Sequence, residues 1–180
     1  MAEWSNKGAG ESDEWYTPKY VFDALGETFD LDVANAAIGG AHVPCRESFG
    51  AEGLERQWHG FVWMNPPYGH QRTKMLWLRK FFAHGNGIAL VPDRTSAPWW
   101  QEFAPKADAI LFVDGKIKFE RPDGTIGEQP GNGTCLFASG RRAVDALLGA
   151  QSRGLGLTMA RYDYRHLVTL SQDMFPGEAA

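Results

Sequence analysis

The sequence lacks the features of a secreted or membrane protein. It has only two cysteines in 180 residues, Cys45 and Cys135, without the spacing of metal ligands. This favours a reducing compartment and two small core or near-surface side chains. No apolar run approaches the roughly 20 residues of a membrane span, and residues 1–14 hold no apolar segment of signal-peptide length. We therefore expect a cytoplasmic protein.

An excess of basic residues is also missing. The formal net charge of −4 argues against the broad basic surface that gives sequence-indifferent DNA binding, so any contact with nucleic acid must be local. The five histidines show no ligand spacing with carboxylates or thiols, and we expect no metal site. The glycine fingerprint G-x-G-x-x-G of dinucleotide-binding folds is absent as well.

What is present is an ordinary globular composition, with 43% hydrophobic and 22% charged residues. Residues 1–12 are rich in Gly, Ser, Asn and Glu, which predicts a flexible arm. Residues 13–180 are within the usual size of one domain and long enough to bury a core, so a single domain is expected there.

Apolar runs and helical periodicities alternate along the chain, which is the pattern of a doubly wound α/β sheet. Strands are predicted at 29–34, 61–64, 88–91 and 109–113, and helices after Thr17, at 72–82 and from Pro98. Residues 42–58 are interpreted as mostly loop. Further on, 116–119 and 134–138 are predicted to pair as a C-terminal β-hairpin with a long loop, followed by a helix at 141–148 and a strand at 155–160.

The sequence Asn65-Pro66-Pro67-Tyr68 ends one of these strands abruptly. Neither proline can donate to a sheet and both fix φ, so the strand must end at Met64 and continue as a stiff loop. Such a loop presents the Asn65 amide oxygen and the Pro66 carbonyl as fixed acceptors, with Tyr68 as a flat face beside them. Two acceptors suit a planar NH2 group and make its nitrogen more nucleophilic. The structural alternative is a proline turn with a packed tyrosine.

Two earlier segments offer polar groups for a ligand. Thr17 is predicted to cap a helix that has Pro18 in its first turn, and a helix start is a good place for a carboxylate. Asp32 lies at the carboxyl end of a buried strand that is followed by a loop of small residues at 35–40, a position that suits a hydroxylated or cationic part of a nucleoside-type cofactor. Asp32 can equally be a turn former.

The order of these motifs resembles that of a known family. Asp13-x-Trp15-x-Thr17-Pro18, then Leu31-Asp32-Val33-Ala34, then Asn65-Pro66-Pro67-Tyr68-Gly69 is similar to the compact phage-type DNA adenine methyltransferases, over residues 13–138. The segments 92–95, 99–100 and 115–119 are similar to later parts of that family. The resemblance implies a Rossmann-like class I methyltransferase sheet with helices on both faces. It also implies S-adenosylmethionine as methyl donor and the N6 amine of a flipped adenine in DNA as acceptor.

The same resemblance assigns roles to residues. The catalytic loop would be Asn65, Pro66, Pro67 and Tyr68. The cofactor-binding residues would be Trp15, Thr17, Pro18, Asp32, Ala34 and Asn65. The sequence departs from the wider methyltransferase pattern where residues 32–36 replace the Asp-Pro-Ala-x-Gly-x-Gly loop, and where Gly53-Leu54 stands in place of an expected acidic residue.

No block of residues reads as a separate target-recognition domain, so loops must hold the DNA. The candidate basic contacts are Arg72, Lys74, Arg94, Lys116, Lys118 and Arg121, although such side chains are commonly just solvated. Two other functions stay open at this point. One is an amino-methyltransferase acting on protein glutamine, RNA or cytosine N4, and the other is a non-catalytic binding module that retains the fold.

Overall fold

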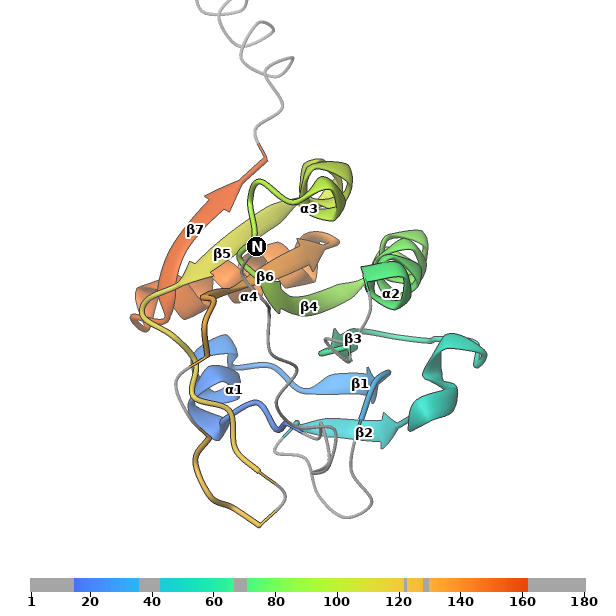
Figure 1. Ribbon diagram of the computed structural model, residues 1–180, viewed down its shortest axis with the longest axis horizontal. Coiled ribbons are helices and arrows are strands. Elements are labelled where there is room, and N and C mark those ends of the chain that lie inside the picture. Colours follow the sequence, from blue (N-terminus) through green and yellow to red (C-terminus); the bar gives the residue numbers. More distant parts are fainter. Residues whose placement is uncertain (1–14, 36–42, 67–70, 122, 128–129, 162–180) are drawn as a thin grey trace, which may run out of the picture.

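The computed structural model describes residues 15–35, 43–66, 71–121, 123–127 and 130–161, and the predicted arm at 1–12 lies outside them. The described part contains a seven-stranded sheet with the order β2-β1-β3-β4-β6-β5-β7 (Figure 1). Its strands are β1 (Phe29–Asp32), β2 (Cys45–Ser48), β3 (Val62–Met64), β4 (Gly87–Pro92), β5 (Ala109–Val113), β6 (Thr134–Ser139) and β7 (Gly156–Ala160). Its helices are α1 (Lys19–Leu25), α2 (Gln71–His84), α3 (Pro98–Phe103) and α4 (Arg141–Ser152), with short 3-10 turns η1 (Ala51–Leu54) and η2 (Ala104–Lys106).

Strands β2, β1, β3 and β4 are parallel, whereas β6 runs against both of its neighbours, β4 and β5. The ends of β1, β3 and β4 and the start of β6 therefore meet at one edge of the sheet, which we call the carboxyl edge. The chain leaves β1 for β2 on one side and later returns to β3 on the other side of β1. In open α/β sheets, ligands bind outside the carboxyl ends of the strands at such a change of direction.

The helices cover both faces of the sheet, as predicted. One apolar cluster packs α1 and α4 against one face and includes Trp63, Leu90 and Leu136. The other cluster packs α2 and α3 against the opposite face and includes Met64 and Phe137. Successive strand residues point to opposite faces of a sheet. The two clusters therefore show to which face each polar residue near the strand ends points.

Two predictions about secondary structure are wrong. Residues 42–58 contain the strand β2, which pairs in parallel with β1 through Phe29↔Cys45 and Asp32↔Ser48. Residues 116–119 form no strand, and β6 pairs with β4 and β5 instead. The segment instead buries Ile117 and Phe119 in the cluster with α1, and Glu120 makes isolated bridges to Tyr16 and Ile126. The predicted C-terminal hairpin of 116–119 with 134–138 is therefore absent, and 134–138 lies within a central strand of the sheet.

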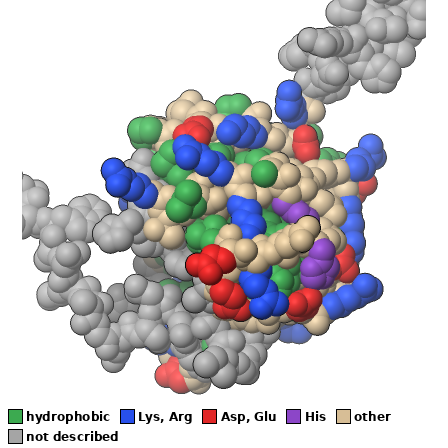
Figure 2. Space-filling view, turned by 90° about the vertical axis from the view of Figure 1, so that its right-hand side faces the viewer, with side chains coloured by type: hydrophobic (Ala, Val, Ile, Leu, Met, Phe, Trp, Pro, Cys, Tyr) green, Lys and Arg blue, Asp and Glu red, His purple; other side chains and the backbone are tan. Residues whose placement is uncertain are grey.

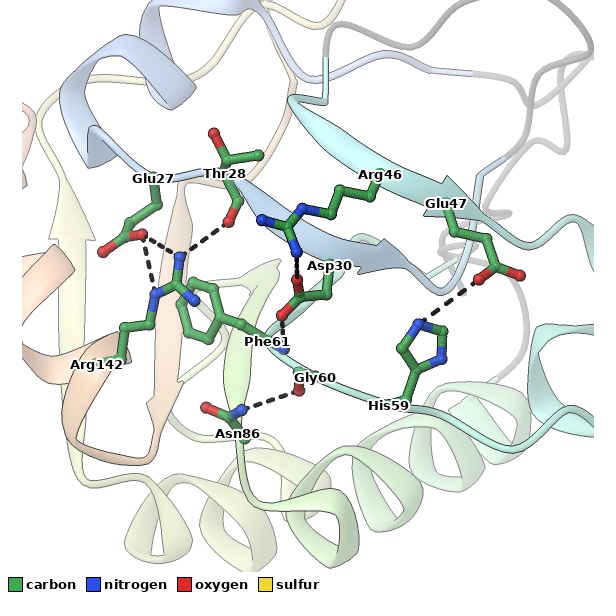
Figure 3. Close-up of polar contacts among 10 residues, drawn as sticks. All are labelled: Glu27, Thr28, Asp30, Arg46, Glu47, His59, Gly60, Phe61, Asn86 and Arg142. Atoms are coloured by element: carbon green, nitrogen blue, oxygen red, sulfur yellow. Dashed lines mark hydrogen bonds and ion pairs between the residues drawn. The ribbon is translucent and has the colours of Figure 1, made fainter.

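The edge opposite to the carboxyl edge is held by a polar network (Figure 3). Asp30 accepts the Phe61 N–H at 2.8 Å and pairs with Arg46 at 3.1 Å, which locks β1 beside the start of β3. The Asn86 amide donates to the Gly60 carbonyl at 2.9 Å. Arg142 lies over the Phe61 ring and pairs with Glu27 at 2.7 Å. These contacts tie β1 to β2, to the start of β3 and to α4, so we interpret their role as structural.

Candidate active site

Asn65 follows directly after β3 at the carboxyl edge. Asn65 lies two residues after Trp63, and alternate strand residues share a face, so its side chain points to the face covered by α1. There its Nδ2 donates to the Thr17 hydroxyl at 3.3 Å. Its Oδ1 is buried and has no hydrogen-bond partner among the described residues. A buried carbonyl oxygen without a donor is costly, and native proteins rarely leave one except where a ligand or water supplies the partner.

Thr17 is buried, but it does not cap α1 as the sequence predicted. The helix begins at Lys19, and the residue at its N-cap position is Pro18, which has no side chain that could accept a bond. Because the Thr17 hydroxyl lies one residue too early to reach the first turn, it accepts the Asn65 amide instead. Thr17 therefore belongs to the surroundings of Asn65, and Pro18 is buried beside it.

Asp32 ends β1, one strand away from Asn65, and its side chain lies on the same face because Leu31 and Val33 point to the other. Only 3% of Asp32 is exposed. Its Oδ1 accepts the Ala34 N–H at 3.2 Å, which partly offsets the effect of burial. Burial raises the pKa of this carboxyl from 3.8 to about 7. Burying a carboxyl group destabilises its ionised form, and a buried carboxyl group at the end of a strand is typical of a ligand-binding position.

The segment before Thr17 is attached to the long connection between β5 and β6. The Tyr16 N–H donates to the Glu120 carbonyl at 2.8 Å, and the Glu120 N–H donates back at 3.0 Å. The guanidinium of Arg121 lies 5.2 Å from the centre of the half-buried Trp15 ring, and the Gly127 backbone packs against that ring. Trp15 thus anchors two segments that close over the α1 face of the sheet.

Gly53, noted in the sequence as a departure from the methyltransferase pattern, has a packing reason. A Cβ at this position would lie 1.9 Å from the Val33 carbonyl oxygen, so no side chain fits there. The Gly53 carbonyl also accepts hydrogen bonds from Trp58 Nε1 at 2.7 Å and from Lys80 Nζ at 3.1 Å. The residue just before it, Glu52, keeps an exposed acidic side chain next to this turn.

The basic residues proposed from the sequence differ in exposure. Arg72, Arg94, Lys116 and Lys118 are exposed, and Arg121 is half-buried over Trp15. Lys74 is only 8% exposed, and its ammonium lies 4.8 Å from the centre of the Trp99 ring. Burial, with Arg94 nearby, lowers the pKa of Lys74. Seen from the side of α2, basic and acidic side chains are interspersed over the surface (Figure 2).

Two members of the predicted catalytic loop, Pro67 and Tyr68, lie outside the described residues, whereas Pro66 is described and buried. The structure adds a residue that the sequence reasoning missed. Thr134, the first residue of β6, is 5% exposed, and its Oγ1 also lacks a hydrogen-bond partner among the described residues. The sequence does mark Thr134, because it is a polar residue that follows a glycine-rich loop and begins a mostly apolar strand.

The described residues contain no group of three or more His, Cys, Asp or Glu side chains that could hold a metal ion, and none of their helices is long and apolar enough to cross a membrane. No curated protein and no solved structure matches the chain. The family model described as DNA N-6-adenine-methyltransferase (Dam) matches residues 5–142, which include Thr17, Asp32, Asn65 and Thr134. With this match over most of its length, the chain belongs to the Dam family of DNA N-6-adenine-methyltransferases.

Proposed function

We propose that this protein methylates the N6 amine of adenine in DNA with S-adenosylmethionine as the donor, at the carboxyl edge between β1 and β6. The observation that carries the proposal is the buried Oδ1 of Asn65, which has no hydrogen-bond partner among the described residues. An exocyclic NH2 group would give that oxygen a donor. The family match supports adenine in DNA as the source of this amine.

The residues present fit the proposed cofactor. Asp32 is a buried acceptor at the end of β1, beside the small residue Ala34, and Thr17 is hydrogen-bonded to Asn65, which follows the neighbouring strand β3. The donor would supply an electrophilic methyl group. Asp32 would hold its hydroxyl or amino groups, whereas Thr17 and Pro18, with Trp15 behind them, would form the opposite wall.

Asn65 would raise the reactivity of the amine. The lone pair of an aromatic NH2 is delocalised into the ring, which makes it a poor nucleophile. Hydrogen bonds from both its N–H groups, to Asn65 Oδ1 and to the Pro66 carbonyl, would enrich the nitrogen in electron density at the moment of attack. Polar groups that are fixed in advance in a water-excluded site make the largest single contribution to transition-state stabilisation in many enzymes. Here the Thr17 hydroxyl holds the Asn65 amide in place.

The DNA would have to deform for this reaction, because N6 of a stacked adenine cannot reach the edge of a sheet. We propose that the base is flipped out and stacks on Tyr68, a role that rests on the sequence motif. The exposed Arg72, Arg94, Lys116 and Lys118 would contact phosphates locally, which agrees with a net charge of −4. Lys74, buried over Trp99, would instead support the start of α2.

The test is to incubate purified protein with methyl-labelled S-adenosylmethionine and, separately, adenine-containing duplex DNA, RNA or total cell protein. The proposal expects label in DNA and N6-methyladenine after its digestion to nucleosides. Label in RNA or protein alone, label at cytosine N4, or no transfer to any of them would contradict it.

A further inference from the structure

The hydroxyl of Thr134 is the second buried side-chain polar atom that lacks a partner within the described residues, after Asn65 Oδ1. With 5% of the residue exposed, water cannot readily replace a missing partner. A buried hydroxyl without a hydrogen bond destabilises the folded protein. Its presence at the carboxyl edge therefore points to a partner that lies beyond the described residues, such as a bound ligand.

Thr134 lies on the same edge and the same face as Asn65. It has the parity of Leu136, which packs with α1 and α4, just as Asn65 has the parity of Trp63. The strand register places Thr134 opposite Pro92 and Met64 opposite Ala89. Thr134 is thus two strands from Asn65, about 10 Å across the sheet, and about two residues further toward the loops.

The backbone before Thr134 is held firmly to the loop after β4. The Asp93 N–H donates to the Gly133 carbonyl at 3.1 Å, and a Cβ at Gly133 would lie 2.2 Å from the Asp93 carboxylate. Arg94 Nε donates to Asn132 Oδ1 at 3.3 Å. These contacts fix the start of β6, so the Thr134 hydroxyl has a defined position before any ligand arrives.

Three polar side chains now lie in order along one face of the carboxyl edge: Asp32 on β1, Asn65 after β3 and Thr134 on β6. Under the proposed function, on which this inference rests, the cofactor lies on the Asp32 side of Asn65. The methyl acceptor must then approach from the opposite side, over β4 and β6. That is the side on which Thr134 is found.

We propose that the Thr134 hydroxyl donates a hydrogen bond to a ring nitrogen of the target adenine, at the edge of the base opposite to the amine held by Asn65. The ring nitrogens of adenine are acceptors, and a threonine hydroxyl can donate one bond. The separation of two strands favours N3, which is the ring acceptor farthest from the amino group. Thr134 is thus a residue that binds and orients the methyl acceptor and has no part in holding the donor.

The experiment compares Thr134→Val, which removes the hydroxyl at nearly constant volume, with Thr134→Ser, which keeps it. Thr158→Val in β7 is the matched control, because the Thr158 hydroxyl already has a partner, the Leu147 carbonyl at 3.0 Å. Each protein is examined by thermal melting, by calorimetry with adenosylhomocysteine, and by turnover on a duplex whose target is adenine, 3-deazaadenine or 7-deazaadenine.

We expect Thr134→Val to melt no lower than the parent and to bind adenosylhomocysteine as tightly, yet to lose about ten- to a hundredfold in kcat/KM on adenine DNA. Thr134→Ser should keep most of the activity. On 3-deazaadenine, which has no N3, Thr134→Val and the parent should have the same kcat/KM. On 7-deazaadenine the difference between them should persist. Thr158→Val should show the reverse pattern, with a lower melting temperature and unchanged turnover.

Failure of this inference differs from failure of the proposed function. A parent protein that transfers no methyl group to DNA contradicts the proposed function and this inference with it. If the parent is active, four results each overturn the assignment of Thr134 alone. They are parental turnover in Thr134→Val, weaker binding of adenosylhomocysteine, a lower melting temperature in both Thr134 variants, and a loss that is unchanged on 3-deazaadenine.

Discussion

Replacing Asp32 with asparagine is expected to remove a pH dependence from the stability of the protein. Burial raises the pKa of this carboxyl from 3.8 to about 7, so the folded state holds a proton that the unfolded state has already released. The stabilisation that this bound proton contributes is fully present below pH 3.8. It decreases as the pH rises and is lost above the pKa of the folded state. The whole difference corresponds to about 4 kcal/mol, and the part that falls between pH 5 and pH 8 to about 2.5 kcal/mol.

The assay is urea denaturation of the parent and of Asp32→Asn at pH 5, 6, 7 and 8, compared as the difference in unfolding free energy. Other titrating groups cancel in this difference. We expect the variant to gain about 2.5 kcal/mol relative to the parent between pH 5 and pH 8, with most of the gain below pH 7. A constant offset from the new amide group does not affect that trend.

Asp30→Asn is the matched control on the same strand. The Phe61 N–H, with Arg46 and Arg142 nearby, holds the pKa of Asp30 below its ordinary value, so it is ionised in both the folded and unfolded states throughout this range. Its stability difference from the parent should therefore be independent of pH between 5 and 8. A difference for Asp32→Asn that is equally flat would refute the reasoning about the buried carboxyl.

Two further predictions concern the ligands. We expect the cofactor's hydroxyl or amino groups to bind to the ionised form of Asp32, because a carboxylate accepts hydrogen bonds at both oxygens. The affinity for adenosylhomocysteine should then rise about tenfold per pH unit up to about pH 7 and level off above it. Calorimetry at pH 5.5 to 8.5 measures this trend, and a flat profile contradicts it. Tyr68→Phe should keep most of the activity because the ring face stacks on the flipped base, whereas Tyr68→Ala should stay folded and lose DNA methylation. Fluorescence of 2-aminopurine at the target position reports the flipping, and a folded Tyr68→Ala protein that methylates DNA at the parental rate would disprove this role.

Much of the sheet could be predicted from the sequence, because its central strands are short apolar runs that end at prolines or small residues. The two prolines after Asn65 fix the end of β3, and the apolar run from Ile88 marks β4. The strand β2 could not be predicted in this way, since it is an edge strand of mostly exposed residues and its sequence, Cys-Arg-Glu-Ser, has neither an apolar run nor a β-branched residue. Its pairing with β1 creates it.

The candidate site was predicted in its parts and not in its connections. Asn65 and Asp32 could be identified from a motif and from a strand end, but the bond between Asn65 and Thr17 joins residues 48 positions apart. The protonation of Asp32 depends on burial by distant segments, which local sequence does not show. Thr134 meets Asn65 at one edge only because β6 runs antiparallel between β4 and β5. Tertiary structure decides each of these properties.

Methyl transfer to adenine in duplex DNA by Asn65→Ala tests whether the Asn65 amide oxygen activates the target amine. Its matched control is Asn86→Ala, which removes an amide whose Nδ2 already donates to the Gly60 carbonyl at the opposite edge of the sheet. Asn65→Ala should melt close to the parent and bind adenosylhomocysteine within about twofold, but lose roughly a hundredfold or more in turnover. Asn86→Ala should be less stable and as active per folded molecule as the parent. An Asn65→Ala protein that methylates DNA at the parental rate would contradict the account.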